Sequence, residues 1–392
     1  MEVSPTGTFV KASIMNDWPS GEDGIPVGWT VENEDVDPTA TPTPGKYLTF
    51  ASEGNTTLAL SNTGDNAPAL FYSFDAIDWN TWDYSELTFS ADKPLYICGD
   101  NPNGFSKSAA EFSYFVTSGS QFSVTGDVMS LLNYYGEIPC AFCFYQLFAN
   151  NNGLTAGPSL PAKTLASHCY DSMFYKCSAL ATAPELPAGA LAESCYAYMF
   201  SNCSKLKSAP DLPNTSLASG CYTGMFLRCL SLETAPSLPA LTLADDCYSY
   251  MFWRCASLVS APELPARYLA NNCYECMFKG CSSLTSAPEL PAITLRERCY
   301  AQMFANCTNL SSAPELPASS LDTGCYEQMF IDCPKINYIN CLAKDIIYDG
   351  GLCTSDWLSG VSSSGTFVKS SDMEDWPIGV SGIPEGWTVE EL

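Results

Sequence analysis

The sequence predicts an α+β repeat protein, a solenoid of about eight units that each hold a short strand and a short helix, preceded by a small β-sandwich domain. One pattern, Cys-Tyr-x-x-Met-Phe-x-x-Cys, occurs seven times at a spacing of 26 residues, and such a period is typical of a solenoid. A non-repeating segment of short apolar runs and turn residues precedes it. The first cysteines of the copies are Cys169, Cys195, Cys221, Cys247, Cys273, Cys299 and Cys325.

Within one copy, the apolar spacing predicts a two-turn helix followed by a strand. Tyr196, Met199, Phe200 and Cys203 fall at i, i+3, i+4 and i+7, which is one face of a helix. The alternating run Leu206–Pro210 indicates a strand that its proline ends. A unit this short cannot bury both faces alone, so neighbouring units must close the core by stacking.

The copies at the two ends of the array depart from the pattern. An eighth copy begins at Cys143 and carries Asn151 where the others have their second cysteine. The last copy has Ile336 in the leucine column. Terminal repeats are expected to be atypical because they cap the core.

These motifs resemble the leucine-rich repeats of the BspA type, which occur in surface proteins of gut and oral anaerobic bacteria and in their phages. The likeness rests on the Met-Phe-x-x-Cys-x-x-Leu core, as in residues 277–284, and on the Leu-Pro-Ala-x-x-Leu segment that follows it. It covers residues 143–345. The resemblance implies a right-handed solenoid with a strand-lined concave face, and adhesion or host-surface binding in large modular proteins.

Twenty cysteines would ordinarily suggest a disulfide scaffold, but fourteen of them fall in two periodic columns. The two cysteines of one copy would lie ~12 Å apart along a helix, and a disulfide needs Cα atoms about 4.4–6.8 Å apart. We therefore expect buried free thiols that act as small hydrophobic groups, and no cofactor. Zinc at Cys273, Cys276 and Cys281 is the alternative, and Cys276 is otherwise a candidate exposed thiol.

The chain divides into five predicted parts. Residues 46–138 are the predicted β-sandwich, residues 139–345 are the repeat solenoid, and residues 34–45 are a Pro/Thr-rich linker. Residues 1–33 carry an element that recurs 358 positions later, within a C-terminal cap and tail at 346–392. Each copy is expected to form a strand pair packed on a neighbour, and the duplication indicates one period of a larger array.

Charge and composition exclude several classes of function. The chain has 17 basic and 43 acidic residues, which disfavours nucleic acid and anionic lipid as partners. No run of about 18 apolar residues encodes a membrane span, and no secretory signal opens the chain. His168 is the single histidine, and no nucleophile, base or metal-ligand set stands out, so no enzyme is predicted.

Three sets of residues are candidates for binding. The pair after Met-Phe varies most between copies and places large apolar and basic side chains on the outer wall, which is typical of binding hot spots. An acidic row follows the strand prolines and either attracts a basic partner or remains a solvated edge. Aromatic residues of the head either stack on sugars or fill its core. The three sets are Tyr175, Lys176, Leu227, Arg228, Trp253 and Arg254; Glu185, Asp211, Glu263, Glu289 and Glu315; and Trp79, Trp82 and Tyr84.

The function that fits these features is non-catalytic recognition or adhesion. The solenoid would bind a protein or a glycan on a cell surface, and the protein would be extracellular, on a cell surface or on a virion. The alternative is a structural virion or assembly component in which the solenoid is a spacer, as in a phage fibre or tail.

Overall fold

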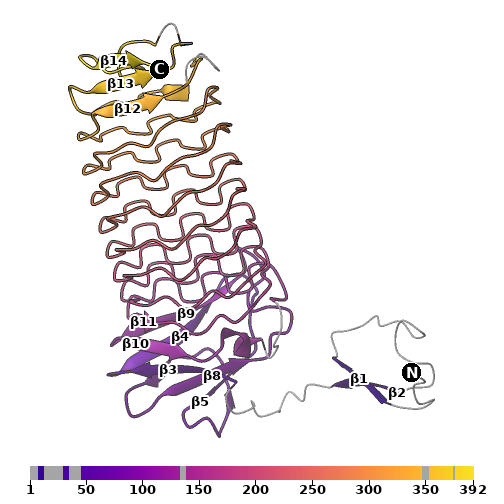
Figure 1. The fold of residues 1–392 in the computed structure, drawn as a ribbon. Coiled ribbons are helices and arrows are strands. Elements are labelled where there is room, and N and C mark those ends of the chain that lie inside the picture. The colour runs from indigo at the N-terminus through magenta and orange to yellow at the C-terminus, as the bar shows by residue number, and fades with distance from the viewer. Residues whose placement is uncertain (1–7, 13–29, 35–45, 133–137, 347–352, 374–375) are drawn as a thin grey trace. The chain divides into compact units, whose positions relative to one another are not determined.

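A computed structural model describes residues 8–12, 30–34, 46–132, 138–346, 353–373 and 376–392 (Figure 1). The chain divides into two units, Met1–Gly45 and Lys46–Leu392. In the first unit, strands β1 (Thr8–Ala12) and β2 (Thr30–Glu34) pair in parallel, with Thr8 opposite Thr30. Residues 34–45 of the predicted linker lie outside the described residues except for Glu34.

The second unit begins with two sheets that share an aromatic core. One sheet has the strand order β11-β10-β3-β8-β5-β6 and the other β7-β4-β9. Phe50 and Phe115 are fully buried between them, with ring centroids 5.4 Å apart. The elements are β3 (Leu48–Ser52), β4 (Thr56–Asn62), β5 (Leu70–Ser73), β6 (Asn80–Thr81), β7 (Leu87–Phe89), β8 (Leu95–Gly99), β9 (Ser113–Gly119), β10 (Phe122–Thr125), the 3₁₀ helix η1 (Val128–Leu131) and β11 (Leu154–Ala156).

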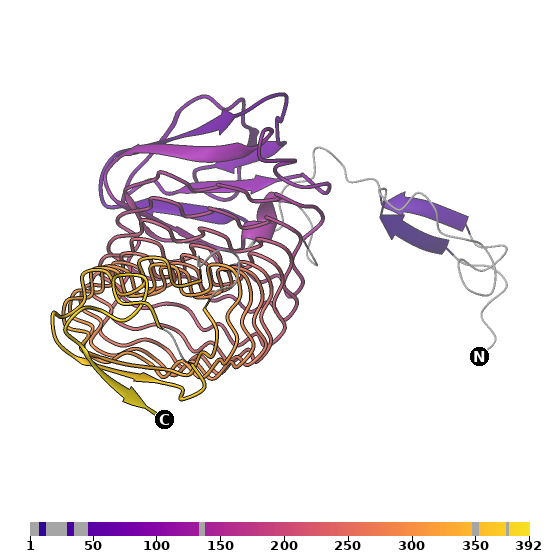
Figure 2. The ribbon, with the colours of Figure 1, turned by 90° about the horizontal axis from the view of Figure 1, so that it is seen from above.

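The rest of the unit is a periodic region in which each 26-residue coil lies on the next, as the view along the stack shows (Figure 2). The predicted helix is wrong: the described residues contain no α-helix. Alternate amides of the motif donate to the following coil, as Tyr196 N does to Cys221 O (3.1 Å). The amides between them donate three residues back, as Met199 N does to Tyr196 O (3.3 Å). These interactions form a wall of hydrogen-bonded turns.

Left-handed residues at every fourth position produce this turn wall. Ser194, Tyr198 and Asn202 have φ of 50°, 51° and 63°, and the equivalent residues of the other coils are also left-handed. A residue with positive φ interrupts a right-handed helix. The burial prediction nevertheless holds, because Tyr196, Met199 and their partners in the motif are at most 2% exposed.

The predicted repeat strands are reduced to single paired residues. Between β11 and Tyr338 the described chain has no strand, and contacts such as the Ser208–Thr234 and Ser286–Ser312 pairs are isolated parallel bridges. Each run soon reaches prolines, as at Pro210 and Pro236, and proline has no amide hydrogen to donate to a ladder.

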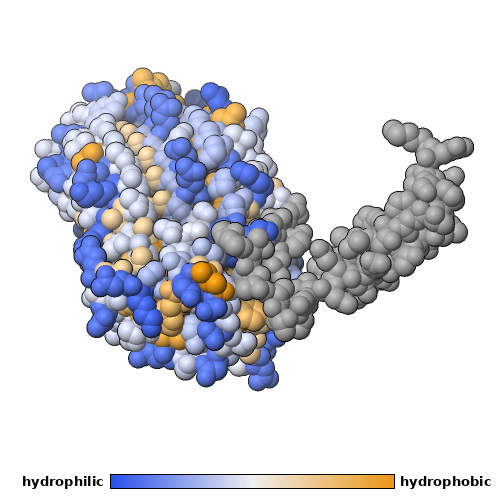
Figure 3. All heavy atoms as spheres, turned by 90° about the horizontal axis from the view of Figure 1, so that it is seen from below, coloured by the Kyte–Doolittle hydropathy of each residue, from blue (hydrophilic) through white to orange (hydrophobic). Residues whose placement is uncertain are grey.

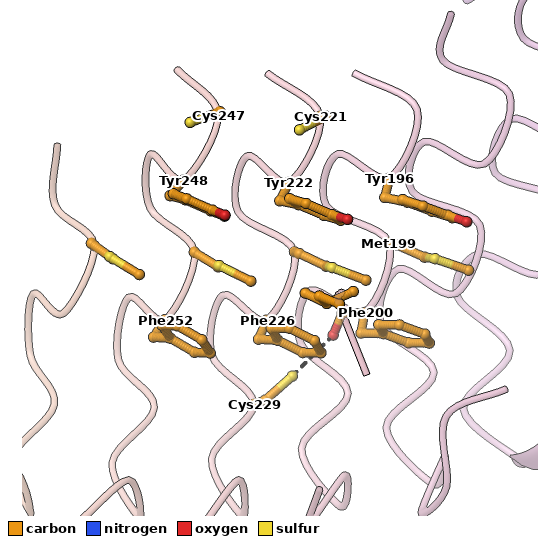
Figure 4. Packing of buried hydrophobic residues seen from close by; sticks show 14 of the residues in the cluster. Tyr196, Met199, Phe200, Cys221, Tyr222, Phe226, Cys229, Cys247, Tyr248 and Phe252 are labelled. Atoms are coloured by element: carbon orange, nitrogen blue, oxygen red, sulfur yellow. Dashed lines mark hydrogen bonds between the residues drawn. The ribbon is translucent and has the colours of Figure 1, made fainter. Parts of the chain in front are cut away.

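Stacked aromatic rings fill the interior of the coils. Phe200 and Phe226 have ring centroids 5.8 Å apart and planes 9° apart, and Tyr196 and Tyr222 are 6.0 Å and 4° apart (Figure 4). Offset stacking of this kind stabilises a core beyond simple area burial. The rings repeat along the stack because each motif places the same side chain at the same point of its coil.

The periodic cysteines are free thiols with no measurable exposure. Those of the second column donate their S–H to the carbonyl oxygen of a phenylalanine in the preceding coil, as Cys229 does to Phe200 (3.1 Å; Figure 4). Cys276, a candidate exposed thiol, is buried at 3% exposure. Among the described residues, no three His, Cys, Asp or Glu side chains are grouped as metal ligands.

Special contacts close both ends of the stack. Asn151 accepts from the amide of Thr117 on β9 (2.9 Å) and donates to Phe115 O (2.8 Å), which joins the first coil to the head. At the other end, β12 (Tyr338–Cys341), β13 (Thr366–Lys369) and β14 (Thr388–Glu391) form a parallel sheet. Trp357 stacks on Tyr326 of the last full coil at 6.0 Å.

The duplicated terminal elements adopt the same strand pairing. Thr366 lies opposite Thr388, a 22-residue offset that equals the offset between Thr8 and Thr30. In the C-terminal copy, β13 also pairs with β12 and so continues the repeat region. No helix among the described residues is long and apolar enough to cross a membrane.

Candidate partner-binding groove

A groove of about 780 Å³ crosses the outer face of the turn wall. Each of four successive coils contributes its variable pair, the two residues between the buried phenylalanine and the second cysteine. The wall therefore sets the spacing of these side chains, and the sequence of each coil sets their chemistry. The lining residues are Gln146, Ser172, Tyr175, Lys176, Tyr198, Ser201, Asn202, Leu227, Arg228, Trp253 and Arg254.

The second residue of each variable pair is left-handed and precedes a buried cysteine. Lys176, Arg228 and Arg254 have φ between 59° and 60° and are exposed, while Cys177 and Cys229 beside them are fully buried. The inward cysteine fixes the coil, so its neighbour is free to extend into solvent. The basic side chains of the groove thus occupy one equivalent position in three coils.

Glycines of the following coils make room for two large side chains of the groove. A Cβ atom added at Gly224 would lie 2.4 Å from the ring of Tyr198, and one added at Gly280 would lie 3.1 Å from Cγ of Arg254. Both glycines also have positive φ, of 59° and 74°. These glycines therefore allow Tyr198 and the stem of Arg254 to lie close against the next coil.

Aromatic rings and cations lie side by side in and beside the groove. The Arg254 guanidinium is 5.8 Å from the Trp253 ring centroid, and Lys279 Nζ is 5.7 Å from it on the next coil. Lys176 Nζ is 4.9 Å from the ring of Tyr175. Such cation–π contacts hold the rings and charges in place at modest energy, ~0.5–1 kcal/mol at exposed sites.

The groove is positively charged although the chain is strongly acidic. None of its lining residues is acidic, and Lys176, Arg228 and Arg254 form no ion pair with a carboxylate of the described residues. In contrast, Arg298 forms ion pairs with Glu275 (2.8 Å) and with Glu327. It lies outside the groove, two coils after Arg254. The three basic side chains of the groove therefore keep their hydrogen-bond donors available for a ligand.

Half-buried tyrosines add protonated hydroxyl groups to this wall. Burial is the main cause that raises the pKa of Tyr250 to about 12, and the charge of Glu275 adds to it. Burial likewise raises the pKa of Tyr198. Both hydroxyls remain hydrogen-bond donors at neutral pH.

The structure brings all six predicted outer-wall residues, Tyr175, Lys176, Leu227, Arg228, Trp253 and Arg254, into this groove. Their binding of a partner stays a prediction. The sequence reasoning missed Tyr198, Ser201, Asn202, Gln146 and Ser172, which complete the lining. The sequence reasoning considered only the pair that follows Met-Phe, whereas Tyr198 and Ser172 lie one four-residue turn before such pairs.

The predicted acidic row is exposed on a different part of the coils. All five side chains are exposed, and four of them line hollows between successive proline-rich segments: Glu185 and Asp211 line one hollow, and Glu263 and Glu289 line another, while Glu315 lines neither. One hollow of about 410 Å³ is lined by Glu263, Glu289 and prolines. No charged partner from the described chain lies on this row, and a solvated edge remains compatible with it.

The head aromatics are mostly packed inside the head. Trp82, a candidate for sugar stacking, is 2% exposed, and its Nε1 donates to Ser85 O (2.8 Å), so its ring offers no free face. Trp79 is half-buried against the Tyr47 ring at 5.8 Å. Tyr84 is half-buried and donates to Pro68 O (2.6 Å). These contacts favour the core-filling interpretation.

Comparisons with known proteins identify no relative of this chain. No protein-family model matches the chain, and no curated protein or solved structure is detectably similar to it. The regular 26-residue recurrence of buried cysteine, tyrosine and phenylalanine establishes a repeat protein.

Proposed function

We propose that the protein is a non-catalytic recognition or adhesion protein whose outer groove binds a protein or glycan on a cell surface. The observation that carries the proposal is the groove itself, in which four coils align unpaired basic and aromatic side chains. Aromatic and arginine residues dominate binding energy at protein surfaces. The face of the molecule shown in Figure 3 is largely hydrophilic, with apolar residues in small groups.

We also propose that the repeat region is a leucine-rich-repeat solenoid of the BspA type, acting outside the cell or on a virion. The 26-residue period supports this relationship, as does the fully buried leucine column that includes Leu206, Leu232 and Leu258. Stacked coils suit recognition because they offer a long, rigid face on which outward residues vary without loss of the core.

The test is binding of the purified chain to glycan arrays and to intact cells, with matched variants. Trp253→Ala and Leu227→Ala remove groove side chains, while Glu263→Gln alters the acidic row and serves as the control. We expect each groove variant to weaken binding by about tenfold or more and the control to leave it unchanged. Equal binding by all variants would reject the groove as the site. Ordered incorporation into a particle without a ligand would support the structural alternative.

A further inference from the structure

We propose that the groove binds an acidic polysaccharide whose sugar rings carry carboxylate groups. This inference rests on the proposed function and specifies its ligand. Three features of the groove select this chemistry: positive charges in a row, flat aromatic faces, and small polar side chains between them.

The row of charges requires an extended anion. Arg228 and Arg254 lie on adjacent coils, and Lys176 lies two coils before Arg228. At ~4.8 Å per coil, the outermost charges are ~14 Å apart along the stack, too far for one small anion to contact both. A chain with regularly spaced anionic groups can contact all three.

The chemistry of the cations favours carboxylate as the anionic group. Arginine presents a planar fork of donors that matches the two oxygens of a carboxylate. No carboxylate of the described residues occupies either groove arginine, whereas Arg298 on a coil outside the groove binds two. With 43 acidic and 17 basic residues in the chain, a groove without acids contrasts with the rest of the surface and would draw an anion to this wall.

The remaining lining favours a sugar over an acidic peptide. The indole of Trp253 and the ring of Tyr175 are only partly buried. Lys176 lies over the Tyr175 ring, and Tyr250, Arg254 and Lys279 lie beside the indole. The C–H face of a pyranose would pack on the parts of these rings that the neighbours leave exposed. Asn202 and Gln146 are half-buried, and each donates one N–H within the chain, to Ser201 Oγ and to Tyr145 Oη. Their amide oxygens remain to accept from hydroxyl groups of a sugar. A glutamate-rich peptide would use the cations but would leave these rings and amides without matching groups.

The experiment measures binding of purified full-length chain to oligogalacturonate by calorimetry and tryptophan fluorescence. The matched ligand is the methyl ester of the same oligosaccharide, which keeps the rings and removes the charge. Poly-glutamate tests charge without sugar. We expect oligogalacturonate to bind and its methyl ester to bind at least tenfold more weakly. Added salt should weaken the binding of oligogalacturonate. Failure of the acid to bind, or equal binding of acid and ester, would overturn the proposal.

Variants identify the side chains responsible. Arg228→Gln and Arg254→Gln should each weaken the binding of oligogalacturonate by about tenfold. Arg254→Lys should keep only part of the affinity, because lysine lacks the planar fork of donors that arginine presents. The control is Arg267→Gln, an exposed arginine of the same region outside the groove. Trp253→Ala should weaken the binding of oligogalacturonate more than it weakens the binding of poly-glutamate. If poly-glutamate binds as tightly as the sugar and Trp253→Ala affects neither, the ligand is a generic polyanion and the proposal is wrong.

The outcomes separate this inference from the proposed function. If oligogalacturonate fails while groove variants still abolish cell binding, the groove recognises another ligand and only the present proposal falls. If groove variants leave cell binding intact, the proposed function itself falls. Unchanged circular dichroism and unfolding midpoints show that the variants are folded, so loss of binding is assigned to the groove.

Discussion

Raising the pH above 9 should unfold the repeat region, because its thiols are buried in the protonated form. Burial raises the pKa of Cys195, Cys273, Cys333 and Cys341 from 9.0 to about 12. A group whose pKa is higher in the folded state stabilises the fold fully below its unfolded pKa. That stability is lost as the pH rises through the interval between the two values. The window for these thiols is therefore pH 9 to 12.

The magnitude follows from the size of that shift. At pH 10 an unfolded thiol is mostly ionised and a buried one is not, so each costs the folded state ~1.4 kcal/mol. Four such thiols cost ~6 kcal/mol, which is comparable to the ~5–15 kcal/mol stability of ordinary domains. Burial raises the pKa of the other repeat cysteines in the same direction, as it does for Cys169 and Cys203, which adds to the loss.

The assay is urea unfolding at pH 8 and at pH 10, followed by circular dichroism, with thiol titration at pH 8 as a second measure. The variant Cys195→Ala should lose ~1.4 kcal/mol less than the parent between the two pH values. Cys140→Ser is the control, since Cys140 is half-buried and its pKa is lowered, chiefly by a hydrogen bond with Cys143. Rapid reaction of many native thiols at pH 8, or an unfolding free energy that stays constant to pH 11, would refute the buried stack.

Two further predictions concern packing. Phe226→Ala in the middle of the ring stack should lower the free energy of unfolding in urea by ~3–5 kcal/mol. Leu230→Ala, at a 46% exposed position of the same coil, should lower it little. Similar losses for both variants would contradict the stacked core. Asn151→Cys installs the residue of the other coils but leaves the Thr117 amide without its acceptor, so stability should fall by ~1–3 kcal/mol and exchange of that amide should accelerate. Unchanged exchange at Thr117 would show that Asn151 does not join the head to the coils.

The sequence sufficed to predict which side chains face inward, because burial repeats with the period. Tyr222, Met225, Phe226 and Cys229 are at most 1% exposed, in agreement with the predicted apolar face. The same spacing misled the prediction of local structure. A helix and a chain that turns every four residues both place i, i+3, i+4 and i+7 on one side, so burial alone cannot distinguish them.

The distinguishing signal was present at the left-handed positions. Gly220 and Gly224 occupy two of them in one coil, and Asn202 and Asn306 occupy the third in others. Glycine and asparagine favour positive φ and are poor in helix interiors. Their recurrence four residues apart argues against a helix, although Tyr198 and Arg254 at equivalent positions weaken the pattern. Those larger residues are held left-handed by bonds to the next coil, a long-range cause that local propensity does not contain.

Part of the groove could be predicted from the sequence, because burial of their neighbours leaves the variable pairs free to differ between coils. Each coil must bury its phenylalanine and its second cysteine, so the two residues between them are constrained only by the turn. Internal comparison of the copies therefore identified Leu227, Arg228, Trp253 and Arg254 as free to vary. It could not show that the residues of four coils would meet without an acid among them. That property depends on which coils are adjacent and on how the nearby carboxylates are engaged. Asp171 accepts from Ser172 Oγ and pairs with His168, and Arg298 binds Glu275 and Glu327. No carboxylate of the described residues forms an ion pair with the groove cations.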